Sequence, residues 1–215
     1  MNRCLLLVLA GAFATCIVPG GALQAAGKSR FVEGKHYVRL DPSLDIRGTG
    51  GKVQVLEMFL YTCPHCFELD PKLKDWARGH KNVELKRMPA ILGPTWGEVA
   101  KLYYAAEALG VLDRLHMEFY RAIHEKGVHF DDDSQLRQFV LSHGIDEADF
   151  QRAYWSRAVL DKMNTARLLS VKYHLRGVPV VIVNGKYKTA PFMARSQEEM
   201  LAVLDYLVAK ESSRL

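Results

Sequence analysis

Residues 55–73 read VLEMFLYTCPHCFELDPKL, and two kinds of sequence pattern meet in this stretch. Residues 53–61 are apolar and rich in β-branched and aromatic side chains, which predicts a strand buried on both faces. Residues 67–79 carry apolar side chains at helical spacing, which predicts a helix. Cys63 and Cys66 stand at the junction, so the predicted strand delivers a Cys-x-x-Cys pair into the start of the predicted helix.

A cysteine at a helix N-terminus is more acidic than an ordinary cysteine. Unpaired backbone N–H groups and the helix dipole favour an anion there, so we expect the pKa of Cys63 to be lowered. Pro64 suits the first helical turn because proline has no N–H group that needs a partner. His65 can add a donor or a positive charge beside the sulfur, or it can be a solvated loop residue. Cys66, one turn further in, is expected to be shielded and to act as the resolving thiol.

The lowered pKa of Cys63 favours one direction of thiol–disulfide exchange. Stabilising the thiolate stabilises the reduced form, which makes the disulfide a strong oxidant and favours a protein that donates disulfides. Haem attachment requires Cys-x-x-Cys-His, and residue 67 is Phe. Structural zinc needs four ligands, and neither a second cysteine pair nor finger-like histidine spacing follows, so we expect no metal and no other cofactor. An inert disulfide remains open, although closing so short a loop constrains the unfolded chain little.

The N-terminus predicts export. Residues 1–26 have the layout of a cleavable signal peptide, with Arg3 as the single charge before an apolar run over residues 4–18. An uncleaved anchor is an alternative, although a membrane span needs about 20 apolar residues. A lipoprotein signal ending at Cys16 is another. Outside the cytoplasm thiols tend to become disulfides, which suits the cysteine pair. The possible cleavage sites follow Ala22, Ala25 or Ala26.

The rest of the chain predicts further strands around a block of helices. The chain has 215 residues and a net charge of +5, and its basic residues are scattered among acids, so we expect no nucleic-acid partner. Residues 34–51 are polar and turn-rich and read as an arm leading into the domain. Helical spacing over 98–126 and 134–175 predicts three to five helices. The other predicted elements are strands at 82–88, 180–183 and 186–189, a turn at Asn184-Gly185, and a helix over about 197–210 with Ser196 as N-cap and Glu199 in the capping-box position.

A second signal precedes the predicted strand at 180–183. Pro179 cannot donate a ladder hydrogen bond, so it belongs at the start of that strand. A cis bond between Val178 and Pro179 would expose the Val178 backbone for pairing with an extended peptide beside Cys63. Most prolines are trans, so the residues alone do not predict the cis bond.

The stretch at 55–73, together with LRGVPVVIVNGKY at 175–187, resembles the DsbA family of bacterial periplasmic thiol oxidases. The resemblance covers nearly the whole chain after the signal peptide. It implies a thioredoxin fold, an α/β fold, with residues 27–95 and 176–215 in the thioredoxin-like domain and 96–175 as an inserted helical domain. It also implies that Cys63 is the nucleophile and Cys66 its resolving partner, that Pro179 is cis, and that Val178 tunes contacts with substrates and partners.

Glu57 is the acid within the apolar strand, six residues before Cys63. In the family an acid at this place is buried beneath the active site and helps to move protons; the alternative is a side chain turned to solvent at a sheet edge. Its usual neighbour is a lysine on the next strand, and Lys86 or Arg87 occupies that place here, with Arg87 the better match. Arginine does not share a proton as lysine can, which leaves that part of the relay in question.

These observations predict an exported dithiol oxidase that gives its Cys63–Cys66 disulfide to reduced or unfolded polypeptides. The resemblance implies the periplasm as its location and a DsbB-type membrane quinone reductase as the partner that reoxidises it. We expect a monomer. Two alternatives use the same residues: a disulfide reductase or isomerase, and a non-catalytic holdase whose disulfide is passive. An isomerase usually needs a dimer-forming module, for which the chain has no room.

Overall fold

The strands lie in the N-terminal and C-terminal parts of the described chain, and a run of helices separates the two groups. The computed structural model describes residues 30–44 and 46–213, so the predicted signal peptide lies outside the described residues. The strands are β1 (Val38–Arg39), β2 (Val53–Phe59), β3 (Val83–Pro89), β4 (Val180–Val183) and β5 (Tyr187–Thr189). The helices are the 3-10 turn η1 (Thr49–Gly51), α1 (Pro64–Gly79), α2 (Pro94–Ala108), α3 (Leu112–Lys126), α4 (Asp133–Ser142), α5 (Glu147–Tyr154), α6 (Arg157–Lys172), α7 (Pro191–Ala194) and α8 (Gln197–Ser212).

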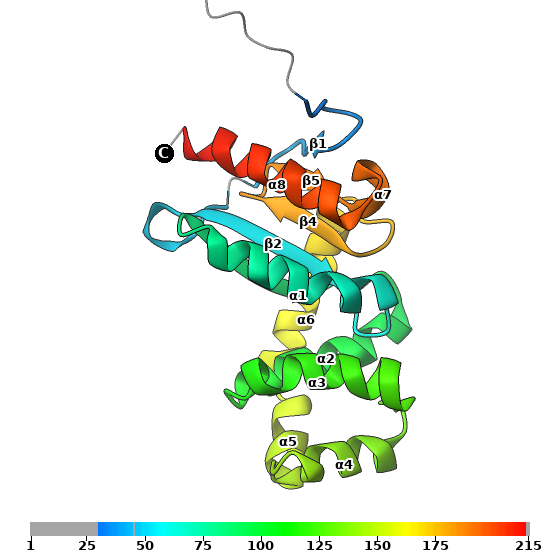
Figure 1. Ribbon diagram of the computed structural model, residues 1–215. Coiled ribbons are helices and arrows are strands. Elements are labelled where there is room, and N and C mark those ends of the chain that lie inside the picture. Colours follow the sequence, from blue (N-terminus) through cyan, green and yellow to red (C-terminus); the bar gives the residue numbers. More distant parts are fainter. Residues whose placement is uncertain (1–29, 45, 214–215) are drawn as a thin grey trace, which may run out of the picture. The chain divides into compact units, whose positions relative to one another are not determined.

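The strands form a mixed sheet in the order β1-β5-β4-β2-β3 (Figure 1). Strand β2 pairs in parallel with β3 and antiparallel with the central strand β4, although helices α2 to α6 come between β3 and β4 in sequence. In this register Glu57 lies opposite Arg87 on β3 and Val181 on β4. Every residue of β2 is buried, as the continuous apolar run predicts, because both edges are paired and both faces are covered.

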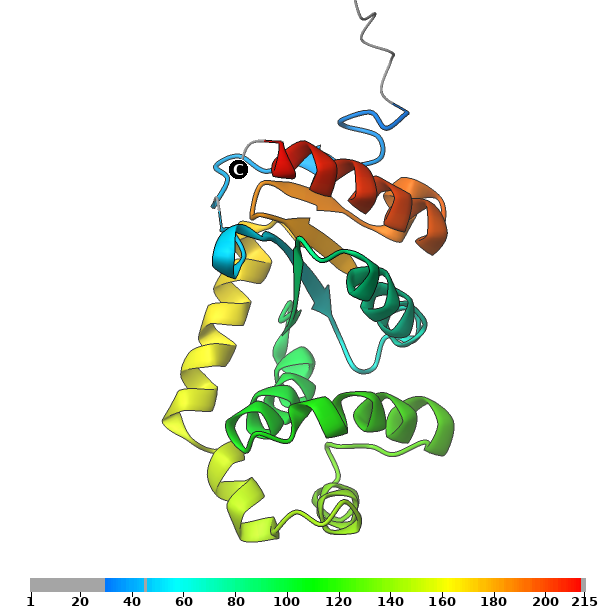
Figure 2. The same ribbon diagram turned by 60° about the vertical axis from the view of Figure 1, so that its left-hand side comes forward.

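Alternate residues of β2 point to opposite faces of the sheet. Val53 and Val55 pack in a core formed with α1 and α8, which cover one face (Figure 2). Leu56 and Met58 pack in a second core on the other face, where the C-terminal part of α6 lies. The same alternation places Glu57 on the α1 side of the sheet, beneath the helix that begins at the cysteine pair.

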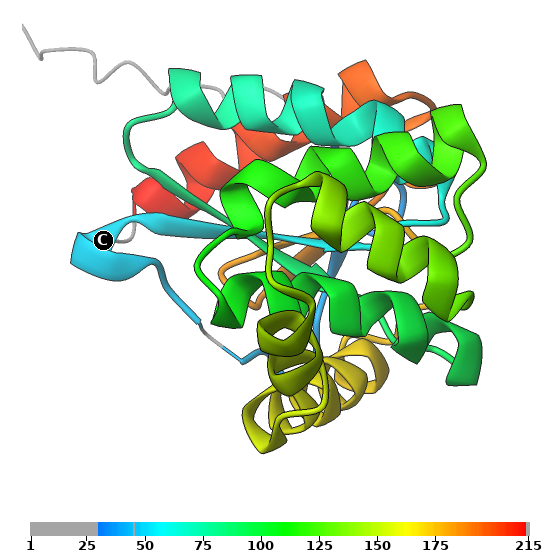
Figure 3. The same cartoon turned by 90° about the horizontal axis from the view of Figure 1, so that it is seen from below.

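Helices α2 to α6 enclose a third core that is rich in aromatic rings. Helix α3 lies beside α1 and contributes Phe119 and Tyr120 to this core (Figure 3). The core extends to Phe59, Tyr61 and Cys66, so the start of α1 packs directly against the helical block. Within residues 30–44 and 46–213 no helix is long and apolar enough to cross a membrane.

The observed elements follow the predicted ones with shifted ends. The first predicted strand stops at Phe59 rather than at residue 61, because the next residues turn and the Cys63 N–H donates to the Leu60 carbonyl at 3.1 Å. The helical block begins at Pro94, four residues before its predicted start. Part of the predicted arm forms β1, which pairs with β5. The Ser196 hydroxyl accepts a hydrogen bond from the Glu199 N–H at 3.0 Å, which confirms the predicted N-cap.

Candidate active site

The turn after β2 and the first turn of α1 hold the two cysteines. Cys63 is the N-cap residue of α1, with extended backbone angles, and Pro64 is the first helical residue. The Cys63 carbonyl accepts hydrogen bonds from the N–H groups of Cys66 and Phe67, both at 3.1 Å. Both cysteines are thiols in this structure; Cys63 is partly exposed and Cys66 is buried. One sulfur is therefore accessible to another molecule, and the second is shielded behind it.

The environment of Cys63 lowers its pKa to about 6, from an ordinary value of 9.0. The largest cause is a hydrogen bond from the Cys66 side chain; the backbone N–H groups of Cys66 and His65 add to it, and partial burial opposes it. Burial and the neighbouring Cys63 thiolate raise the pKa of Cys66 far above its ordinary range. At neutral pH Cys63 is mostly a thiolate and Cys66 a thiol.

His65 lies at the surface of the site. Its side chain is 73% exposed, and Nδ1 lies 3.7 Å from Oε2 of Glu68. A positive charge on His65 is one of the smaller causes that lower the pKa of Cys63. The His65 carbonyl accepts a hydrogen bond from Nε2 of Gln197 at 3.1 Å, which ties the start of α1 to the start of α8.

The loop before β4 approaches Cys63 from the other side. The Cys63 sulfur lies 3.7 Å from the carbonyl oxygen of Val178, and the peptide bond between Val178 and Pro179 is cis. A cavity of about 480 Å³ borders His65, Val178 and Pro179, and Phe192 of α7 lines it with a side chain that is 78% exposed. The structure thus brings the cysteine stretch and the Val-Pro stretch together beside one hollow with both apolar and charged walls.

Glu57 is fully buried beneath the cysteines, on β2. Burial is the largest cause that raises its pKa to about 8, the charge of Asp70 raises it further, and Arg87 opposes both. Its Oε2 lies 3.4 Å from Nε of Arg87, and neither carboxyl oxygen has a hydrogen-bond partner among the described residues. Lys86 instead lies 3.4 Å from Glu84, so Arg87 is the basic residue that faces Glu57.

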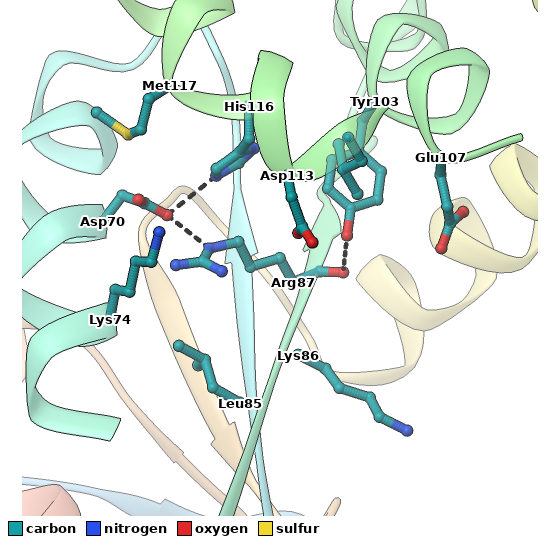
Figure 4. A pocket seen from close by; sticks show the side chains of 11 residues that line it. Asp70, Lys74, Leu85, Lys86, Arg87, Tyr103, Glu107, Asp113, His116 and Met117 are labelled. Atoms are coloured by element: carbon teal, nitrogen blue, oxygen red, sulfur yellow. Dashed lines mark hydrogen bonds and ion pairs between the residues drawn. The ribbon is translucent and has the colours of Figure 1, made fainter. Parts of the chain in front are cut away.

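Arg87 has a closer partner than Glu57. Its Nε donates to Oδ1 of Asp70 on α1 at 2.5 Å, and the same oxygen lies 3.0 Å from Nε2 of His116 on α3 (Figure 4). Burial opposes ionisation of Asp70, but the hydrogen bond from His116 and the charge of Arg87 outweigh it and lower the Asp70 pKa. Nδ1 of His116 lies 2.9 Å from the Tyr61 hydroxyl. A line of polar contacts therefore runs from Glu57 through Arg87 and Asp70 to His116.

The sequence does not single out Asp70, His116 or Tyr61 as residues of the site. One signal was available: Asp70 shares helical spacing with Cys66, Leu69 and Leu73, which are the buried residues of α1. An acid within an apolar stripe needs a partner, because an unpaired buried charge is costly. Within the described residues no three His, Cys, Asp or Glu side chains are grouped so that they could hold a metal ion.

Known proteins are similar to this chain in sequence and in fold. The family model of the DSBA-like thioredoxin domain matches residues 54–205. The thiol:disulfide interchange protein DsbA of Azotobacter vinelandii is 36% identical over 181 residues, which is 84% of each chain. That of Pseudomonas aeruginosa is 32% identical over 206 residues, 95% of this chain and 96% of the relative.

Solved structures agree with the sequence comparisons. A crystal structure of a Pseudomonas aeruginosa DsbA variant superposes with a TM-score of 0.80 at 31% identity, and it covers 85% of this chain and 99% of its own. The oxidoreductase DsbA from Xylella fastidiosa superposes with a TM-score of 0.78 at 34% identity, with 85% and 98% covered.

The fold and the cysteine pair define a thiol:disulfide oxidoreductase with a thioredoxin fold, as the sequence predicts. The chain belongs to the DsbA family, and it is an enzyme of the dithiol oxidase type.

Proposed function

We propose that the protein donates its Cys63–Cys66 disulfide to reduced client polypeptides, with Cys63 as the sulfur that clients attack. The observation that carries this proposal is the position of Cys63 at the N-cap of α1, partly exposed, with a pKa lowered to about 6. A stabilised thiolate is a good leaving group and favours the reduced enzyme, so the disulfide is readily given away.

The exchange takes place in two steps. A client thiolate attacks Cys63, the Cys63–Cys66 bond breaks, and Cys66 leaves as a thiolate that takes up a proton. A second client thiolate then attacks the client sulfur of the mixed disulfide and releases Cys63 as a thiolate. The client loses two electrons and gains a disulfide, and the enzyme gains the two electrons as a reduced cysteine pair.

Glu57 supplies the proton for Cys66 in this proposal. Cys66 is buried and has a strongly raised pKa, so it does not remain a thiolate. Glu57 interacts electrostatically with Cys66 and, with a pKa of about 8, is largely protonated at neutral pH. A protonated acid held near a leaving thiolate is the group that general acid catalysis requires.

The cavity beside Cys63 is the proposed client site. Val178 presents its backbone next to the Cys63 sulfur, and Pro179 and Phe192 give the cavity apolar walls. Charged residues, among them Lys72, Arg195 and Glu198, line the rest of it. Backbone pairing with apolar side pockets suits an extended, unfolded chain and selects little by sequence. Val178 and Pro179 therefore hold the client, while His65 and Pro64 shape the helix start that activates Cys63.

The cellular setting is part of the same proposal. The protein is exported by a cleavable signal peptide within residues 1–26, works in the periplasm as a monomer, and is reoxidised by a DsbB-type membrane quinone reductase. Residues 27–95 and 176–215 act as the thioredoxin-like domain, and residues 96–175 act as the inserted helical domain. The similarity to DsbA proteins over nearly the whole chain supports this setting.

The first experiment is a redox equilibrium of residues 27–215 against glutathione, with the cysteine pair followed by alkylation. We expect a disulfide that is reduced far more readily than that of thioredoxin, whose potential is about −270 mV. A potential close to that value would favour a reductase instead. Cys63→Ala tests the holdase alternative, because a holdase retains its activity without the sulfur and an oxidase loses it.

A further inference from the structure

His116 belongs to the buried cluster, but it has no role in the proton transfer from Glu57 to Cys66. Its ring lies between Asp70 Oδ1, 3.0 Å from Nε2, and the Tyr61 hydroxyl, 2.9 Å from Nδ1. A neutral ring with its hydrogen on Nε2 satisfies both contacts, since Nε2–H donates to the carboxylate and Nδ1 accepts from the hydroxyl. Burial is the main cause that lowers the His116 pKa, against the opposing effect of Asp70. The neutral ring is therefore the resting form.

Two members of the buried cluster keep fixed charges. Arg87 stays positive, and Asp70, held by Arg87 and His116, stays negative. These two charges balance each other at 2.5 Å. Glu57 and His116 are the remaining members of the line, and each has a side chain that can exist with or without a proton.

A buried cluster resists a change in its net charge. When Glu57 loses its proton, the cluster holds two carboxylates, Glu57 and Asp70, beside the single positive charge of Arg87. A proton on His116 would restore the balance. Arginine also cannot give up a proton to Glu57, so the line needs a second titratable group if its charge is to stay constant.

We propose that His116 is a positioning residue that takes up a proton from solvent as Glu57 gives its proton to Cys66. This inference rests on the proposed function. The carboxyl proton passes to the Cys66 thiolate, which becomes a thiol, and a solvent proton binds Nδ1 of His116. The Tyr61 hydroxyl turns from donor to acceptor, which a hydroxyl can do in place. When Glu57 regains a proton, His116 releases its own to water, and no electrons move in either step.

Solvent reaches His116 from a cavity of about 380 Å³ that its ring helps to line. The side chain of His116 is 9% exposed, whereas that of Glu57 is fully buried. Asp70 favours a charged ring, and Lys74 and Arg87 disfavour it. Figure 4 shows the charged and titratable groups that line the cavity with His116: Asp70 and Lys74 from α1, Lys86 and Arg87 from β3, Tyr103 and Glu107 from α2, and Asp113 from α3. Two further titratable groups, Tyr61 and Tyr120, contact the His116 ring from the aromatic core.

The test measures whether Glu57 and His116 titrate together in the oxidised protein. Infrared absorption of the protonated carboxyl group, assigned by its loss in Glu57→Gln, reports Glu57 across pH 5 to 10. In His116→Gln we expect its midpoint to move to higher pH by about one pH unit, because the carboxylate loses its counter-charge. Conversely, in Glu57→Gln the midpoint of His116 protonation, followed by carbon NMR of the ring, should move to lower pH. This second measurement does not depend on the folding of His116→Gln.

His124 supplies the matched control. It lies on the same helix, and its Nε2 lies 2.8 Å from the Tyr61 carbonyl oxygen, but it does not contact the charged cluster. His124→Gln should leave the Glu57 midpoint where it is. His116→Gln should also oxidise a dithiol peptide about tenfold more slowly in a single turnover at pH 7.

The outcomes separate this inference from the proposed function. A protein that oxidises the peptide, but in which neither midpoint moves or the His116→Gln rate is unchanged, overturns the role of His116 alone. A wild-type protein that cannot oxidise the peptide overturns the proposed function, and the role of His116 with it, whatever the midpoints are.

Discussion

Glu57 and Arg87 face each other across the parallel strands β2 and β3, with Oε2 and Nε 3.4 Å apart. This distance is longer than the 2.5 Å between Arg87 and Asp70, so the arginine is shared unequally between two acids. The acid beneath the cysteines therefore receives only part of the stabilisation that a dedicated partner would give. Burial and the charge of Asp70 outweigh this partial stabilisation, so Glu57 holds its proton at neutral pH.

Glu57→Gln should stabilise the folded protein at neutral pH. The Glu57 pKa rises from 4.5 to about 8 on folding, so between these values the unfolded chain loses a proton that the folded chain keeps. Wild-type stability therefore falls as pH rises through this window, and glutamine removes the penalty. We expect a gain of about 3 kcal/mol in the free energy of unfolding at pH 7 and almost none at pH 4. Urea denaturation at both pH values measures it; an equal gain at both would contradict the raised pKa.

Relative to Cys63→Ser, the reduced wild-type protein should become more stable as pH rises from 6 to 9. The folded-state pKa of Cys63 is depressed to about 6 from 9.0, so the folded thiol ionises before the unfolded one and its stabilisation is lost as pH falls through 6. Urea denaturation of reduced wild type and of Cys63→Ser should diverge over this range, with wild type gaining. Parallel curves would show that the thiolate is not stabilised by folding.

His65→Gln should raise the pKa of Cys63 modestly. The positive charge of His65 is one of the smaller causes of the lowered pKa, while the backbone N–H of residue 65 remains in the variant. We expect the midpoint of thiolate absorbance to rise by less than about one pH unit, and the disulfide to become less oxidising. As a control, Glu68→Gln removes the acid that lies 3.7 Å from His65, and it should not raise the midpoint. A midpoint unchanged in His65→Gln would make this histidine an ordinary solvated residue.

Asp70→Asn should destabilise the protein strongly. The carboxylate is buried and is the closest partner of Arg87, whose side chain is only 18% exposed. Removing one member of a buried ion pair leaves the other charge uncompensated and typically costs about 3–5 kcal/mol. Asp75→Asn on the same helix removes an exposed pair with Arg78, which should cost less than about 1 kcal/mol. Similar losses in both variants, measured by urea denaturation, would show that the cluster contributes little to stability.

The local part of the site could be predicted from the sequence, because strand, cysteine pair and helix are adjacent in the chain. Burial of Glu57 was also predictable, since the acid lies in a strand apolar throughout. The contact between Asp70 and His116 was not, because it depends on how α3 packs beside α1. Strand β1 was missed for a related reason. Its two residues are too few to show a periodic pattern, and they form a strand only because they pair with β5.

Because β4 follows the helical block in the chain, the sheet can be completed only after those helices have been made. In a chain that emerges N-terminus first, β2 and β3 are available well before residues 180–183 arrive to pair with the open side of β2. Until then β2, all of whose residues are buried in the folded protein, has a free edge, which is a template for pairing with other chains. Truncations that end before β4 should aggregate rather than yield a smaller active enzyme.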